Sequence, residues 1–173
     1  NGLNNLMSGN DGSNVINGAG GVDIMYGFGG DDVYYANSFL DVVSEELICG
    51  CDAGGTDKVI SSDDCYLPDY VENLTLPGTA DLMGIGNDED NILRGNSGDN
   101  ILDGDEGNDK IDGGAGADEM YGGSEDDTYY VDDAGDQTIE DYTPGVDDGG
   151  TDLVIAAISW TLNDYIENLN LAG

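Results

Sequence analysis

Glycine recurs every nine residues along much of this chain, and that period constrains the fold more than any other feature. The series runs through positions 9, 18 and 27 in the first half and 86, 95, 104, 113 and 122 in the second. A large apolar residue stands seven positions after each of these glycines, as Met25, Leu102 and Ile111 illustrate. A fixed short period indicates a solenoid, in which each repeat buries its apolar residue against neighbouring repeats. The chain is therefore predicted to be all-β, with short strands joined by glycine turns.

A longer repeat, with an offset of 95 residues, contains the shorter one. The segment GGTD at 54–57 recurs at 149–152, and YVENL at 70–74 recurs as YIENL at 165–169. Strand-like patterns follow or include these segments, at 59–60 and 72–76 in the first copy and at 154–155 and 167–171 in the second. We divide the chain into a first unit, 1–78 (nonapeptide turns 1–35, longer coils 36–78), and a second unit, 79–173 (nonapeptide turns 79–130, longer coils 131–173). Both units are expected to form one continuous solenoid.

The charge of the chain requires explanation, because 38 acidic residues face three basic ones and no histidine, giving a net charge of -35. Repulsion from phosphates argues against a nucleic-acid partner. Either the chain is a disordered acidic segment, or bound cations neutralise it when it is compact. A hydrophobic content of 38%, with ten tyrosines, favours the second interpretation when cations are present and disorder when they are absent.

The nine-residue spacing is suited to calcium. Glycine allows positive φ and close approach of the backbone, so a glycine turn can direct carbonyl oxygens to a shared point. Position six of each turn holds Asp or Asn, and Ca²⁺ takes about six to eight oxygen ligands from carboxylates and carbonyls. The triplet that follows is a minimal strand, with only its central residue pointing inward. Two nonapeptides form one coil, so turns n and n+2 lie about 4.8 Å apart and are expected to share an ion.

This rule predicts calcium ligands at position six and at the glycines of positions one and four. Asp109 and Asp127 are expected to form the strongest site because both are charged, whereas pairs containing asparagine should bind more weakly. The predicted pairs are Asp109–Asp127, Asn100–Asp118, Asn91–Asp109, Asn14–Asp32 and Asn5–Asp23, and the predicted glycine ligands are Gly104, Gly107, Gly113, Gly116, Gly122, Gly18, Gly21, Gly27 and Gly30.

The longer coils offer further acidic residues whose role the sequence leaves open. Asp41, Asp57, Asp136 and Asp152 could add ligands or could be solvated turn residues. Each Tyr-Tyr pair, at 34–35 and 129–130, is expected to place one ring inward and one outward.

The cysteines, the absence of histidine and the hydropathy of the chain bear on whether it could hold zinc, act as an enzyme or cross a membrane. Cys65 could form a disulfide with Cys49 or Cys51, or the three could be small buried hydrophobes; zinc is unsuited because a fourth ligand is missing. Without histidine or a nucleophile motif, the chain is expected not to be an enzyme. No apolar run approaches the roughly 18 residues of a transmembrane helix.

The segment Gly113–Tyr121 fits the pattern G-G-x-G-x-D-x-U-x at every defined position, where U is a large apolar residue. Over its full length the chain resembles the RTX (repeats-in-toxin) proteins, a group that includes haemolysin-type toxins, proteases, lipases, alginate epimerases and adhesins. The resemblance implies a right-handed parallel β-roll or β-solenoid with Ca²⁺ in its turns. It also implies type I secretion, folding in extracellular calcium, and a location outside the cell or on the bacterial surface. Departures from the pattern are Asn at position six in several turns, and Glu89 and Glu125 at position four.

Two functions follow from the resemblance and the repeats. The first is a structural module of an adhesin stalk or filament, in contact with further repeats or copies of itself; the absence of a polar capping element at either end suggests a segment of a longer array. The alternative is an accessory module that stabilises an extracellular RTX enzyme or binds a polysaccharide. An exposed row of aromatic rings would favour carbohydrate binding, and the candidates are Tyr26, Tyr35, Tyr121 and Tyr130.

Overall fold

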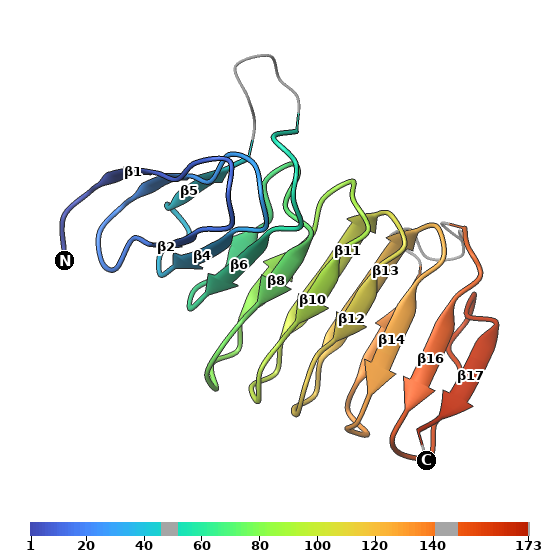
Figure 1. Cartoon of the computed structure of the whole chain (residues 1–173). Helices are drawn as coiled ribbons and strands as arrows, with labels where there is room; N and C mark the ends of the chain where they lie inside the picture. The colour runs from blue at the N-terminus through green and yellow to red at the C-terminus, as the bar shows by residue number, and fades with distance from the viewer. Residues whose placement is uncertain (46–51, 141–148, 173) are drawn as a thin grey trace.

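The computed structural model describes residues 1–45, 52–140 and 149–172, and the regular elements in these residues are all β-strands (Figure 1). One face is a nine-stranded parallel sheet that runs the length of the molecule. No helix among the described residues has the length and apolarity needed to cross a bilayer. The strands of the long sheet are β2 (Val15–Asn17), β4 (Val33–Ala36), β6 (Lys58–Ser61), β8 (Asn73–Thr75), β10 (Ile92–Arg94), β12 (Lys110–Asp112), β14 (Thr128–Val131), β16 (Leu153–Ala156) and β17 (Asn168–Leu171).

The opposite face consists of two shorter parallel sheets. A three-stranded sheet covers the N-terminal part and a five-stranded sheet covers the rest. Because the chain alternates between the two faces, consecutive strands up to β16 belong to different sheets, and this confirms the parallel β-roll predicted from the nine-residue period. The strands of these sheets are β1 (Leu6–Ser8), β3 (Ile24–Tyr26) and β5 (Val42–Ser44), then β7 (Cys65–Tyr66), β9 (Met83–Ile85), β11 (Ile101–Glu106), β13 (Glu119–Ser124) and β15 (Gln137–Ile139).

The core is a thin layer of apolar side chains that the strands of both faces contribute. The inward positions are those predicted: Met25, Leu102 and Met120 are completely buried, whereas the residues directly before and after each of them are partly or fully exposed. The tyrosine pairs behave in the same way, with Tyr34 0% and Tyr35 39% exposed. Burying one apolar side chain per nonapeptide gives a thin core, so the roll has little hydrophobic stabilisation per residue.

The register shows which turns are neighbours. Ile111 on β12 pairs with Tyr129 on β14, eighteen residues later, so turns n and n+2 stack on the same side of the roll. In the longer coils the partner lies twenty-five residues on, as for Tyr129 and Val154. The additional residues leave the sheet register unchanged, and acidic side chains that precede these strands therefore come into one row.

The last strand corrects one expectation. The alternating pattern at 72–76 and 167–171 predicts strands with one buried face, and Leu74 and Leu76 are indeed buried. The equivalent residues on β17, Leu169 and Leu171, are 37% and 68% exposed. Because β17 is the outermost strand of the long sheet, no further coil among the described residues packs against it.

Candidate metal centres

The Asp and Asn residues at position six that directly precede the strands of the long sheet form a row, which we call a ladder. The backbone N–H of each residue donates to a side-chain oxygen of the equivalent residue in the next coil. In the second unit these bonds run from Asn91 to Asp109 (2.7 Å), from Asp109 to Asp127 (2.8 Å) and from Asp127 to Asp152 (2.9 Å). In the first unit they run from Asn14 to Asp32 and from Asp32 to Asp57, both 2.6 Å.

A second ladder is formed by the position-six residues that directly precede the strands of the two shorter sheets. The N–H of Asn5 donates to Asp23 (2.8 Å), and that of Asn100 donates to Asp118 (2.7 Å). Every pair predicted from the rule of turns n and n+2 is therefore brought together, including Asn14–Asp32 and Asn91–Asp109. Whether the members of a pair share an ion stays a prediction.

In six of the aspartates that accept a ladder bond, one carboxylate oxygen takes that bond and the other is buried without a hydrogen-bond partner. A buried carboxylate is costly unless it is paired, protonated or bound to a metal ion. The three basic residues of the chain are too few to neutralise these groups. The orphaned oxygens are Oδ2 of Asp23, Asp32, Asp57, Asp109, Asp118 and Asp127, and Oε2 of Glu45 and Glu140.

Glycine at position one provides the space into which these oxygens point. A Cβ built on Gly104 would collide with Oδ2 of Asp109 and with the carbonyl oxygen of Gly122 in the stacked turn. At Gly95 the same space holds the Asn100 side-chain oxygen and the Gly113 carbonyl oxygen. Carboxylate or amide oxygen and carbonyl oxygen thus converge from turns n and n+2, and this mixed oxygen set suits Ca²⁺.

Burial changes the protonation of the orphaned carboxylates in the absence of a cation. Desolvation raises the pKa of Asp109 to about 8 and that of Asp127 to about 7. It also raises the pKa of Asp118 to about 6, and neighbouring acidic residues add to the effect in all three. Near neutral pH Asp109 and Asp127 therefore take up a proton or a cation in the folded chain, and Asp118 does so at slightly lower pH.

The backbone divides the nonapeptide turns into two classes that follow the residue at position six. Turns with aspartate there have positive φ at positions two and four, as at Asp105 (77°) and Gly107 (109°) in the turn of Asp109. This accounts for glycine at position four in Gly21, Gly30, Gly107 and Gly116, whereas Glu125 takes a φ of 75° without that freedom. The turns of Asn14, Asn91 and Asn100 have no positive φ at either position.

The asparagine turns are closed by their own side chains. The N–H at position two donates to the side-chain oxygen at position six, from Asn10 to Asn14, Asn87 to Asn91 (both 2.8 Å) and Asn96 to Asn100 (2.7 Å). In the aspartate turns the equivalent Oδ2 has no partner. We call the two classes closed and open turns. The distinction depends on the backbone as well as on side-chain charge, which was the only difference considered from the sequence.

Two of the acidic residues in the longer coils join the ladders with an orphaned or buried carboxylate. Asp57 and Asp152 are 1% exposed, so the solvated-turn interpretation is wrong for them. Asp136 is also buried, but both of its oxygens accept backbone N–H groups, from Asp118 on one side and from Asp132 and Asp133 on the other. Asp41 repeats that arrangement with Asp23, Asn37 and Ser38.

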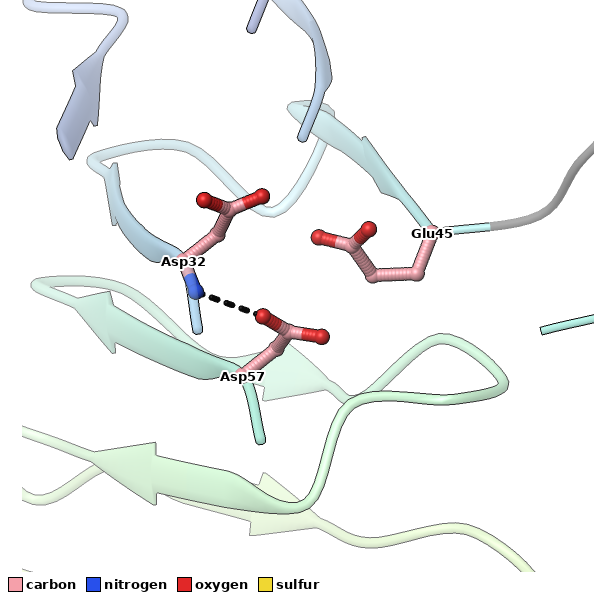
Figure 2. A group of neighbouring side chains, drawn as sticks. All are labelled: Asp32, Glu45 and Asp57. Carbon is pink, nitrogen blue, oxygen red and sulfur yellow. Dashed lines mark hydrogen bonds between the residues drawn. The ribbon is translucent and has the colours of Figure 1, made fainter. Parts of the chain in front are cut away.

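Two glutamates that the nonapeptide pattern did not predict complete the set of orphaned carboxylates. Glu45 directly follows β5, lies 1% exposed, and meets Asp32 and Asp57 in one cluster (Figure 2). We call these three residues the first carboxylate trio. The second carboxylate trio is Asp127, Glu140 and Asp152, which are the equivalent residues of the second copy of the 95-residue repeat. That repetition at an offset of 95 was the signal that could have identified both glutamates.

The aromatic candidates for carbohydrate binding do not form one row. Tyr35 and Tyr130 lie on β4 and β14 of the long sheet, with four strands between them, whereas Tyr26 and Tyr121 lie on the opposite face. Nothing in this arrangement favours the carbohydrate-binding alternative.

The predicted disulfide partners of Cys65, which are Cys49 and Cys51, lie outside the described residues. Burial raises the pKa of the Cys65 thiol to about 12.

Comparison with known proteins identifies the repeat. The profile of the RTX calcium-binding nonapeptide repeat matches the chain four times, over residues 4–43, 85–120, 94–129 and 103–137, which together span more than half of it. No curated protein and no solved structure matches the chain at a significant level. With the parallel β-roll and its ladders of buried aspartate, these matches show that the chain belongs to the family of RTX calcium-binding nonapeptide-repeat proteins.

Proposed function

We propose that this chain is a non-catalytic structural module of a secreted or cell-surface protein, and that it folds when calcium binds after export. The observation that carries the proposal is the set of buried carboxylate oxygens without partners along both ladders. Removing these groups from water without a counter-charge would cost more than the thin core supplies. Bound calcium supplies that counter-charge, so binding and folding become one equilibrium.

The net charge makes the equilibrium responsive to calcium concentration. At -35 the calcium-free chain repels itself and stays expanded, which suits passage through a secretion channel. At the higher calcium concentration outside the cell, each ion bound to the folded state adds stability in proportion to the logarithm of its concentration.

The direction in which the buried carboxylate oxygens point supports a structural role for the bound ions. The orphaned oxygens of Asp109, Asp127 and their equivalents face stacked turns inside the roll rather than an open cleft. Calcium bound there would stiffen the stack of coils, which is a property useful in a stalk or filament. We therefore favour an adhesin stalk or extracellular filament as the setting of the module.

Circular dichroism during a calcium titration tests this proposal. We expect a disordered spectrum in chelator and a cooperative gain of β-strand signal on addition of Ca²⁺, with Mg²⁺ at the same concentration giving a much smaller change. Mg²⁺ is the appropriate control because it demands near-octahedral geometry at about 2.0–2.1 Å and releases its water reluctantly. A chain that is fully folded in chelator would overturn the proposal.

A further inference from the structure

The two carboxylate trios differ from the ladder positions in that they join both faces of the roll. Asp32 and Asp57 directly precede β4 and β6, neighbouring strands of the long sheet. Glu45 follows β5 of the shorter sheet and reaches the same cluster, as Figure 2 shows. In the second trio, Glu140 follows β15 in the same way. Both glutamates thus come directly after the terminal strand of a shorter sheet.

We propose that each carboxylate trio is an enclosed calcium site, separate from the sites between nonapeptide turns, that fastens the longer coil to the roll. The inference rests on the proposed calcium-dependent folding, and it assigns two ions that the nonapeptide pattern does not predict. Glu45, Asp57, Glu140 and Asp152 all lie outside the nonapeptide turns.

Hydrogen bonding leaves one free oxygen on every carboxylate of the first trio. Oδ1 of Asp32 accepts the N–H of Asn14, and Oδ1 of Asp57 accepts the N–H of Asp32. Oε1 of Glu45 accepts the hydroxyl of Tyr34. The remaining oxygen of each residue is buried without a partner. Three buried carboxylates in one cluster, each with an oxygen that lacks a partner, place a charge of up to -3 where water does not reach.

The second trio repeats this arrangement at Asp127 and Glu140. Oδ1 of Asp127 accepts the N–H of Asp109, and Oε1 of Glu140 accepts the hydroxyl of Tyr129. Oδ2 of Asp127 and Oε2 of Glu140 are again buried without partners. Asp152 is 1% exposed and holds the N–H of Asp127. The cluster is therefore built twice in one chain, by residues that are each 95 positions apart.

The sequence around each glutamate shows that the acidic group itself has been retained. Glu45 follows Val-Val-Ser at 42–44, whereas Glu140 follows Gln-Thr-Ile at 137–139. None of the three preceding residues is the same in the two copies, yet glutamate directly follows both strands. The packing of β5 and β15 thus tolerates different residues, whereas the position after each strand holds a carboxylate in both copies, as a metal ligand would require.

The size of the cluster fits calcium. One ligand oxygen from each trio member lies within 4.8 Å of the other two. Oxygens bound to one Ca²⁺ at about 2.3–2.6 Å can be separated by up to about 4.6–5.2 Å, so three such oxygens can bind a single ion. Glycine supplies the room, because a Cβ on Gly27 would collide with Asp32, Glu45 and Tyr34.

The count of bound ions tests the proposal directly. The double variant Glu45→Gln/Glu140→Gln keeps side-chain size and removes one charge from each trio. Its matched control is Glu89→Gln/Glu106→Gln, which removes two charges from exposed positions. Equilibrium dialysis against Ca²⁺ of the full chain should show two fewer bound ions in the first variant than in the parent, and no loss in the control.

Equal numbers of ions in both double variants, each folded at saturating calcium, would overturn the trio sites and leave the proposed function intact. A parent chain that binds no calcium would overturn the proposed function and the trio sites together. These two failures are therefore distinguishable in one experiment.

A second measurement decides the matter if Glu45→Gln/Glu140→Gln does not fold. Tb³⁺ takes the same oxygen ligands as Ca²⁺ and luminesces when a nearby tyrosine absorbs light. Tyr34→Phe/Tyr129→Phe keeps both rings in the core and should lose most of the sensitised emission, because those hydroxyls contact the trio glutamates. The control Tyr35→Phe/Tyr130→Phe should retain it. A loss no greater than that of the control would overturn the proposal.

Discussion

The backbone N–H of Asp109 donates a 2.8 Å hydrogen bond to Oδ1 of Asp127, eighteen residues later in the stacked turn. Oδ2 of both residues is left buried without a partner. The bond fixes the orientation of the Asp127 carboxylate, so its free oxygen lies beside Gly122 and the Tyr129 hydroxyl. The same residue is also a member of the second trio. Asp127 therefore joins the nonapeptide ladder to the longer coil.

Replacement of Asp127 should weaken calcium-dependent folding more than replacement of a closed-turn residue. For Asp127→Ala we expect the calcium midpoint measured by circular dichroism to rise by about tenfold, equivalent to about 1.4 kcal/mol. Asn14→Ala should shift it much less, because the Asn14 oxygen already accepts the N–H of Asn10. Equal shifts in the two variants would contradict the distinction between open and closed turns.

Conversion of a closed turn into an open one should increase calcium affinity. Asn100→Asp places a carboxylate beside Asp118, and its turn has Asn96 and Gly98 at positions two and four, which tolerate positive φ. We expect a lower calcium midpoint and lower stability in chelator, since the new charge is then uncompensated. Asn91→Asp should gain less, because Glu89 occupies position four. Isothermal titration calorimetry measures both variants, and a midpoint unchanged by Asn100→Asp would count against the idea.

In calcium-free buffer the folded chain should gain stability as the pH falls. Burial raises the pKa of Asp109 to about 8 and that of Glu140 to about 9, whereas unfolded carboxyls titrate near about 4. The folded state therefore binds more protons between these values. This contribution to stability is fully present below about pH 4 and is lost as the pH rises through about 8 to 9.

Far-UV circular dichroism without calcium should accordingly show more β-strand signal at pH 5 than at pH 9. The variant Asp109→Asn/Glu140→Gln should lose part of this dependence, which separates the buried groups from the general reduction of charge. The same spectrum at both pH values in the parent would show that protons do not replace calcium in the interior.

A methyl group at Gly122 should destabilise the calcium-loaded chain. The Cβ of alanine would overlap Oδ2 of Asp127 and the hydroxyl of Tyr129. Overpacking of this kind costs about 1–3 kcal/mol. Urea unfolding at saturating calcium should show that loss for Gly122→Ala, whereas Gly2→Ala, whose Cβ would contact nothing, should leave the free energy of unfolding unchanged.

Much of the fold follows from the nine-residue period. Because strand side chains alternate, one apolar residue per nonapeptide identifies the inward positions, and Met25, Leu102 and Met120 are buried as expected. The register of eighteen residues also follows, since two nonapeptides complete one coil, and it brings Asp109 to Asp127. The exposure of Leu169 could not be predicted from its pattern, because it depends on which coil lies next to the strand.

The sequence by itself determined the roll, its stacking and the aspartates at position six, because all of these repeat at a fixed local spacing. Only the tertiary structure decided that Glu45 meets Asp32 and Asp57, since the glutamate reaches them from the opposite face of the roll. It also decided that asparagine turns close on their own side chains while aspartate turns stay open. A local sequence pattern shows which residues occupy a turn. Whether a carboxylate oxygen has a hydrogen-bond partner depends on the backbone N–H groups that neighbouring coils place beside it.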